Sequence, residues 1–172
     1  TAWGGKSLYT DFRPPSSGGK VGPYYQKMID EIHATLADLK NTRYELAGFV
    51  WMQGWNDMCT PPAIPDYADN LVHLAKDIRK EFKAPNLPVI VGELGNGGPV
   101  KKAGAMADLR KAQQQGASRI KNAVFVNTTA FARPNNLSPN TGHGHHWFGN
   151  AESYFLVGDA LAKATIELIE KK

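Results

Sequence analysis

Hydrophobic residues recur at helical spacing in the segments 23–40, 66–82 and 150–168. In each of them roughly every third or fourth residue is apolar, as on the buried face of a helix. Pro23 opens the first segment, where its missing N–H costs nothing. Asp66 and Asn150 precede the other two as expected N-cap residues. With residues 104–118, whose composition favours a helix, the chain is expected to form four main helices.

Continuous apolar runs of strand length separate these helices, at residues 46–52, 88–94 and 123–128. Unbroken runs of this kind are typical of strands that are buried on both faces. Strands that alternate with helices predict an α/β fold, a three-layer sandwich in which helices cover both faces of a parallel sheet. Ligand sites of such folds lie beyond the carboxyl ends of the strands. We therefore look for chemistry in the segments that follow the three strands.

Composition narrows the classes of partner. The 172 residues fit a single domain. Lys and Arg total 20 against 16 Asp and Glu, a net charge of +4, and the two signs are interspersed. A nucleic-acid surface needs a clustered basic stripe, so none is expected. No apolar run has the length of a membrane span, and no leader sequence is visible. Cys59, the single cysteine, excludes a disulfide within the chain.

The segment after the first strand, residues 53–57, carries polar side chains behind a glycine. Gly54 permits a sharp exit from the strand, which allows the amide of Asn56 to point over the end of the sheet. Acyl transfer needs such an N–H donor for its developing oxyanion, and one donor contributes about 3 kcal/mol. The alternative is that Asn56 and Asp57, both common turn residues, only make a turn.

Three of the five histidines fall within four residues, at His143, His145 and His146. Imidazole is the usual general base of an ester hydrolase because its ordinary pKa lies near working pH. Three close histidines could instead hold a metal ion, but adjacent histidines in a loop seldom point the same way, and no fourth ligand has an obvious spacing. We therefore prefer a base to a metal site, with incidental loop histidines as the interpretation between the two, and expect no cofactor. His33 and His73 lie within expected helices and are assigned to packing or the surface.

The first residues also contain glycines, at positions 4 and 5. The run GKS at residues 5–7 invites comparison with a phosphate-binding loop, but the other glycine of that motif would precede residue 1. Prolines at 14 and 15 also stand where that motif needs a helix. Glycines at a strand exit can instead offer free main-chain N–H groups to an oxyanion. A tight turn alone is the other interpretation.

Together these segments resemble the sequence blocks of the SGNH hydrolase superfamily. The run GWND at residues 54–57 matches the G-x-N-D block at every fixed position. The run WMQG at 51–54 is similar to the W-x-Q-G of the sialate O-acetylesterase-like carbohydrate esterases. The glycines at 4 and 5 resemble the second block of that branch, and residues 146–154 resemble its last block. The likeness extends over residues 1–163.

The resemblance implies a flavodoxin-like serine hydrolase with roles for several residues. Gly4 or Gly5 would supply a main-chain donor to the oxyanion, and Asn56 would supply a side-chain donor. His146 would be the base, with His145 as its rival.

The same resemblance implies supporting residues around the substrate. Gln53 and Asp57 would brace the site. Apart from the resemblance, the polar and aromatic composition of loop 9–17 suggests that it lines a sugar site, with Arg13 as a donor. Glu93, at the end of the second strand, would either orient the imidazole or accept structural hydrogen bonds.

Two positions depart from the family pattern. The family carries an Asp three residues before its catalytic His, where this chain has His143, or Gly142 if His145 is the base. The nucleophilic Ser of the family lies in a block ahead of the glycines, and Ser7, beyond them, is a poor substitute. We therefore expect an N-terminally incomplete domain whose Ser comes from a segment preceding Thr1. A separate N-terminal polypeptide could supply it by pairing with the otherwise exposed edge of strand 46–52.

The leading hypothesis is an esterase that removes acyl groups from carbohydrates and, as the resemblance implies, is secreted or periplasmic. A second hypothesis is a non-catalytic module that binds glycans or serves as a scaffold on a degenerate hydrolase fold. A metal enzyme built on the histidine cluster is the third.

Overall fold

A computed structural model gives the structure and describes residues 2–100 and 102–171. Within these residues three strands form one parallel sheet in the order β1-β2-β3. They are β1 (Phe49–Trp51), β2 (Val89–Gly92) and β3 (Ala123–Val126). In register, Val50 lies opposite Ile90, which in turn lies opposite Val124. The sheet predicted from the sequence is confirmed, with each strand shorter than its apolar run.

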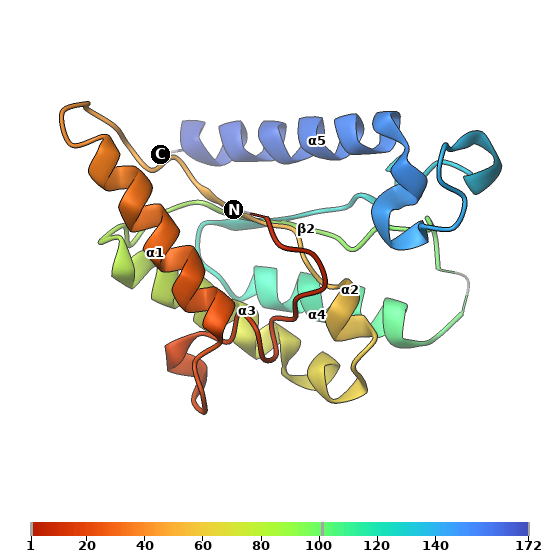
Figure 1. The fold of residues 1–172 in the computed structure, drawn as a ribbon, viewed down its shortest axis with the longest axis horizontal. Coiled ribbons are helices and arrows are strands. Elements are labelled where there is room, and N and C mark those ends of the chain that lie inside the picture. The colour runs from red at the N-terminus through yellow and green to blue at the C-terminus, as the bar shows by residue number, and fades with distance from the viewer. Residues whose placement is uncertain (1, 101, 172) are drawn as a thin grey trace.

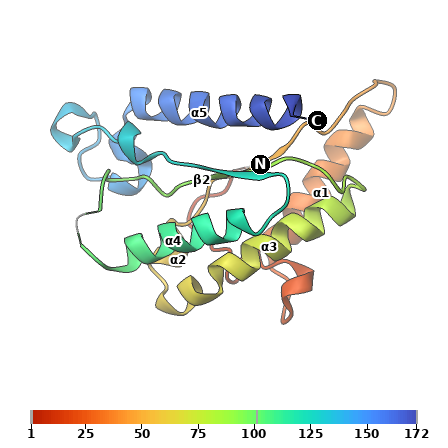
Figure 2. The ribbon, with the colours of Figure 1, turned by 180° about the vertical axis from the view of Figure 1, so that it is seen from behind.

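Helices cover both faces of this sheet, as Figure 1 and the reverse view in Figure 2 show. The helix α5 (Ala151–Glu170) lies over one face, and α3 (Ile64–Glu81) and α4 (Ala105–Ser118) lie over the other. Side chains of a strand alternate between faces, so Val89 and Val91 pack in the α3 cluster whereas Ile90 packs in the α5 cluster. The three-layer α/β sandwich is confirmed.

Two further helices flank β1 in the sequence, one before it and one after it. The helix α1 (Pro23–Asp38) begins at its proline and buries Tyr25, Met28 and Ile29. The short helix α2 (Trp55–Met58) directly follows the end of β1. Single 3-10 turns lie at η1 (Pro15–Ser17), η2 (Pro61–Ala63), η3 (Thr129–Phe131) and η4 (Asn135–Leu137), and η5 (Gly144–Gly149) is a longer, kinked 3-10 segment.

The expected cap at Asp66 is wrong. The helix α3 begins two residues earlier, at Ile64, with Ala63 as its N-cap residue and no side-chain cap. Pro65 explains the shift, since its fixed φ favours the first turn of a helix. The cap at Asn150 is confirmed, because its side chain accepts a hydrogen bond from the backbone N–H of Ser153 over 3.1 Å.

The expectation that residues 46–52 are buried on both faces is also wrong. Val50 and Met52 are 46% and 40% exposed, whereas Trp51 between them is buried. The cause is that α5 packs against β2 and β3, so it leaves its side of β1 uncovered. Among the described residues β1 pairs only with β2. The outer edge of β1 therefore carries unpaired backbone groups beside apolar side chains, as the sequence analysis expected.

Candidate active site

A pocket of about 490 Å³ lies beyond the carboxyl ends of β1 and β2. Segments that are far apart in the sequence meet there: the N-terminal glycines, the turn after β1, the loop after β2 and the histidine segment before α5. The predicted site residues that line it are Gly4, Gly5, Gln53, Asn56, Glu93, His145 and His146. The structure thus brings the residues predicted as oxyanion donors and as the base to one pocket.

Several hydrogen-bond donors of the residues that line this pocket have no partner among the described residues. Within the described residues, neither the N–H of Gly4 nor that of Gly5 donates a hydrogen bond, and the side-chain amide of Asn56 makes none either. Gly5 has a φ of +65°, in the left-handed region that glycine adopts without strain. Free N–H groups at one pocket are what an oxyanion needs.

Gly54 serves close packing rather than a left-handed turn. A Cβ atom at this position would lie 2.8 Å from Cδ2 of Leu109 and 3.1 Å from Nε2 of Gln113. A side chain at residue 54 would therefore push α4 away from the end of β1. The same Gln113, fully buried, donates to the carbonyl oxygen of Gln53 over 2.9 Å and accepts from the N–H of Leu94 over 2.9 Å. Gln113 thereby ties the ends of β1 and β2 together.

Asp57 braces the site from behind and does not line the pocket. Its carboxylate is fully buried and accepts the backbone N–H groups of Leu8 over 2.9 Å and Tyr9 over 3.0 Å. Burial raises the pKa of Asp57, while hydrogen bonds from Gln53, Leu8 and Tyr9 act in the opposite direction. Gln53 Nε2 donates both to this carboxylate and, over 2.7 Å, to the carbonyl oxygen of Lys6. The N-terminal glycine segment is therefore fastened to α2, which carries Asn56.

The histidine segment has an unusual backbone. His146 lies outside the helical region at φ −113° and ψ 34°, and Trp147 and Phe148 both have positive φ, at 52° and 54°. Each such residue without the freedom of glycine costs about 1–3 kcal/mol. The indole of Trp147 is buried, only 4% exposed, in the cluster with Val157 and Leu161. Strain of this kind next to the expected base is compatible with a functional site.

The imidazoles of the segment lie close together. The ring centroids of His145 and His146 are 4.3 Å apart, and His145 also contacts the indole of Trp55, 5.6 Å between centroids. Desolvation lowers the pKa of His145, and repulsion from His146 and then His143 lowers it further. A lowered pKa favours the neutral imidazole, which is the form that can accept a proton.

His143 occupies the position where the family carries an Asp, but it does not take over that role. Its Nδ1 is hydrogen-bonded to Oδ1 of Asn140 over 2.6 Å, and its ring centroid is 6.5 Å from that of His146. A carboxylate does not replace it either. Glu93 lines the pocket, but its carboxylate accepts hydrogen bonds from the N–H groups of Thr128 and Thr129 and from the hydroxyl of Thr129. Of the two predicted roles for Glu93, the structural acceptor is the one supported.

Arg13 does not reach the pocket. Its guanidinium binds the carbonyl oxygens of Gly18 over 2.8 Å and Tyr9 over 3.2 Å, so it holds its own loop together. The role of Arg13 as a sugar donor stays a prediction, which its absence from the lining of this pocket does not support. Its loop is rich in main-chain carbonyl groups that turn inward, which the composition alone does not reveal.

Among the described residues no Ser, Thr or Cys lines the pocket, where the hydroxyl group belongs to Tyr154. Ser7 is buried, and its Oγ bonds Thr10 and Asp11 within a tight turn. Ser16 bonds Nδ1 of His73 over 2.8 Å, but that pair lies where η1 meets α3, away from the pocket. The described part of the chain therefore places the residues predicted as base and oxyanion donors at the pocket, with no candidate nucleophile among its described lining residues.

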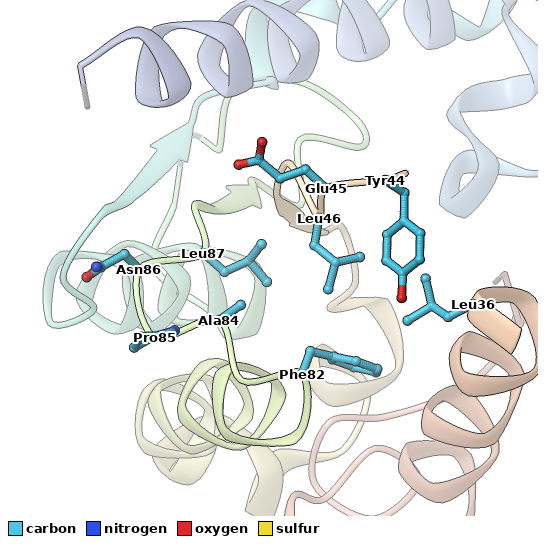
Figure 3. Close-up of a pocket in the computed structure, with 9 residues that line it drawn as sticks. All are labelled: Leu36, Tyr44, Glu45, Leu46, Phe82, Ala84, Pro85, Asn86 and Leu87. Atoms are coloured by element: carbon cyan, nitrogen blue, oxygen red, sulfur yellow. The ribbon is translucent and has the colours of Figure 1, made fainter. Parts of the chain in front are cut away.

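Two other cavities bear on the interpretation. A groove of about 540 Å³ runs along the outer edge of β1, lined by Phe49, Val50 and Met52 among others, and shares His146 with the pocket. A third cavity, of about 370 Å³, lies before the strands, between residues 44–46 and 84–87, as Figure 3 shows. Figure 3 shows mostly apolar side chains there, from Leu36, Leu46 and Phe82. Ligand sites of α/β sheets lie at the opposite, carboxyl ends.

Metal ligation and membrane insertion can be checked over residues 2–100 and 102–171. No group of three or more His, Cys, Asp or Glu side chains there is arranged to hold a metal ion. No helix in the same residues is long and apolar enough to cross a bilayer.

Comparisons with known proteins agree with this arrangement. A family model described as "Carbohydrate esterase, sialic acid-specific acetylesterase" matches residues 1–167. The X-ray structure of a protein from Arabidopsis thaliana superposes with a TM-score of 0.63 at 23% identity. The match covers 90% of this chain but only 56% of that one, so this chain spans little more than half the length of that solved structure. No curated protein matches the sequence.

Proposed function

The chain belongs to the carbohydrate esterase family of sialic acid-specific acetylesterases, and we propose that it carries the base and the oxyanion donors of a serine O-acetylesterase that acts on carbohydrates. One observation carries the proposal: Gly4, Gly5, Asn56 and the two histidines, from three distant parts of the sequence, line a single pocket. Acyl transfer needs N–H donors for an oxyanion and a base for the nucleophile in the same place.

The proposed reaction follows from the groups in the pocket. A Ser hydroxyl gives its proton to His146 while its oxygen attacks the carbonyl carbon of the acetyl ester. The resulting oxyanion accepts hydrogen bonds from a glycine N–H and from the amide of Asn56. The tetrahedral intermediate then collapses, and the imidazolium returns the proton to the departing sugar oxygen. Water, deprotonated by the same imidazole, attacks the acetyl–Ser ester, and acetate leaves as Ser recovers its proton.

The nucleophile is proposed to come from a further segment that pairs with the outer edge of β1. Three features support this: the edge is unpaired among the described residues, the adjoining groove is apolar, and it opens into the pocket. A strand added parallel to β1 would end beside His146, which lines both groove and pocket. His145 lines the pocket but not the groove. For this reason His146 is the preferred base.

A carbohydrate substrate suits the aromatic lining. Trp3, Trp55 and Tyr154 line the pocket together with its polar groups, and binding sites commonly combine apolar walls with a few placed donors. The family description points to acetylated sialic acids or related sugars as the class to test first. Such glycans lie outside cells, so the proposal includes export of the protein, which N-terminal sequencing of material from culture medium or periplasm would test.

Ester hydrolysis by the complete protein tests the proposal. We expect p-nitrophenyl acetate and acetylated sugars to be hydrolysed, and we expect Asn56→Ala and His146→Ala each to lower kcat by about 100-fold or more. Tyr44→Phe, in the remote cavity, is the control. Full activity in both site variants would refute the proposed roles.

A non-catalytic glycan-binding module is the second candidate, favoured by the lack of a Ser, Thr or Cys on the described wall of the pocket. Calorimetry with acetylated sugars separates the two. Binding without release of acetate, in a preparation of the complete protein, would favour the module.

A further inference from the structure

The structure raises the question of what orients the two imidazoles in the pocket. The ring of His143 is bonded to Asn140, whereas within the described residues no hydrogen bond orients the ring of His145 or His146. The family position for an orienting carboxylate is taken by His143, and Glu93 is engaged with threonines. The direction of both rings therefore depends on the main chain that carries them.

That main chain is held at two consecutive carbonyl groups. Nδ2 of Asn96 donates to the carbonyl oxygen of His145 over 2.9 Å, and the hydroxyl of Tyr154 donates to the carbonyl oxygen of His146 over 2.9 Å. The first belongs to the peptide plane before the Cα of His146 and the second to the plane after it. Two fixed planes set φ and ψ of His146 and hence the direction of its Cα–Cβ bond.

We propose that Asn96 and Tyr154 are positioning residues that together form a main-chain clamp, which aims the imidazole of His146 into the pocket in place of an orienting carboxylate. The proposal rests on the function proposed above, since it assigns the clamp to the base of that reaction.

Asn96 is a firm anchor for one side of the clamp. It is 5% exposed and lies in the loop after β2. The guanidinium of Arg110, on α4, binds the carbonyl oxygens of Leu94 over 2.6 Å, Gly98 over 3.0 Å and Asn96 itself over 3.1 Å. Arg110 thus fixes the loop that carries Asn96 to α4.

Tyr154 anchors the other side from the first turn of α5. The start of this helix is fixed by the cap at Asn150 and by the hydroxyl of Ser153, which donates to the carbonyl oxygen of Phe131 over 2.7 Å. The ring of Tyr154 is 48% exposed and lines both pocket and groove. Loss of its hydroxyl alone therefore removes the bond to His146 with little change in packing.

The backbone after His146 shows why a clamp is needed. Trp147 and Phe148 adopt left-handed conformations that neither residue favours alone. Burial of the indole holds Trp147 in place, but it does not determine the peptide planes on either side of His146. With either carbonyl bond removed, the segment can relax toward ordinary backbone angles and turn the imidazole away.

The test uses the intact protein and two clamp variants, Tyr154→Phe and Asn96→Ala. Each has a matched control elsewhere in the fold. Tyr44→Phe removes a hydroxyl from a tyrosine that is 49% exposed. Asn70→Ala truncates an asparagine that is 3% exposed and whose Nδ2 has no partner among the described residues. The readouts are the Cε1–H resonances of His145 and His146 in NMR spectra and the steady-state constants for an acetylated sugar.

We expect the clamp variants to shift and broaden the resonances of His146, and to lower kcat by about tenfold to 100-fold with KM nearly unchanged, because a misplacement of about 1 Å is costly in rate. Both controls should leave the resonances and kcat as they are. If Asn96→Ala does not fold, Tyr154→Phe alone decides.

The outcomes separate the clamp from the function. Unchanged histidine resonances in Tyr154→Phe would overturn the clamp, whatever the activity, as would a variant that loses thermal stability while kcat stays constant. Shifted resonances in a complete protein that hydrolyses no ester would support the clamp as a feature of the structure and refute the esterase proposal.

Discussion

The carboxylate of Asp57 accepts the backbone N–H of Leu8 over 2.9 Å, although the two residues are 49 positions apart. This contact, with the neighbouring bond to Tyr9, joins the N-terminal segment to the turn that carries Asn56. The two oxyanion donors of the proposed reaction come from these two pieces of chain, so their spacing depends on a buried carboxylate that itself does not touch the pocket.

Replacing that carboxylate should weaken the fold. In Asp57→Asn the side chain turns an N–H group toward other N–H groups, and a buried donor left unsatisfied costs about 1–3 kcal/mol. Urea unfolding monitored by circular dichroism measures the loss. Asp66→Asn, exposed on α3, is the control and should unfold near the urea concentration of the unsubstituted protein. Equal midpoints for the two variants would contradict the bracing role.

Close packing at Gly54 leads to a second prediction. Gly54→Ala places a methyl group 2.8 Å from Leu109, and overpacking of this kind costs about 1–3 kcal/mol. Gly158→Ala, in the middle of α5 with no atom within 4 Å of the added carbon, should instead stabilise the protein by up to about 1 kcal/mol. Opposite shifts of the melting temperature are expected, and two shifts of the same sign would contradict the packing argument.

One pair of variants tests the observed N-cap at Asn150 against the predicted N-cap at Asp66, which the structure does not have. Asn150→Ala removes the bond to the N–H of Ser153 and should cost about 1 kcal/mol. Asp66→Ala should cost less, because Asp66 lies inside α3 and caps nothing. Paired denaturant curves give both values. A larger loss at Asp66 would restore the cap that the sequence suggested.

The titration of His145 provides a prediction on pH. Its pKa lies below the ordinary histidine value of 6.5, through desolvation first and then through repulsion from His146 and His143. Between the lowered pKa and 6.5 the unfolded chain binds more protons than the folded one, so this group adds stability above pH 6.5 that is lost as the pH falls through the folded pKa. NMR titration should give a midpoint below 6.5 that rises, without reaching 6.5, in His146→Gln. A midpoint at or above 6.5 in the unsubstituted protein would contradict this.

The order of helices and strands could be predicted because hydrophobic spacing decides it over many residues at once. Features that depend on a single neighbouring residue or element were predicted wrongly. The start of α3 shifted because Pro65 favours the first turn, and Val50 is exposed because of where α5 lies, which the sequence of β1 does not contain.

The candidate site divides in the same way. Asn56, the glycines and the histidines could be proposed from residue type and motif, and they line one pocket. Asn96 and Tyr154 were missed because their partners are main-chain carbonyl groups, which leave no mark in a sequence. Gln113 did offer a signal, as a polar residue on the buried face of a helix. Arg13 does not line the pocket, because its guanidinium binds carbonyl oxygens of its own loop.

The bare flank of β1 has a practical consequence for anyone who purifies this protein. Strand edges with unpaired amide and carbonyl groups tend to pair with one another. Here the exposed hydrophobic side chains of Val50 and Met52 lie beside that edge. Preparations in which that edge of β1 is unpaired should aggregate as they are concentrated. Co-expression with the polypeptide that pairs with it should keep the protein in solution. Solubility during expression would thus report on assembly well before any substrate is identified.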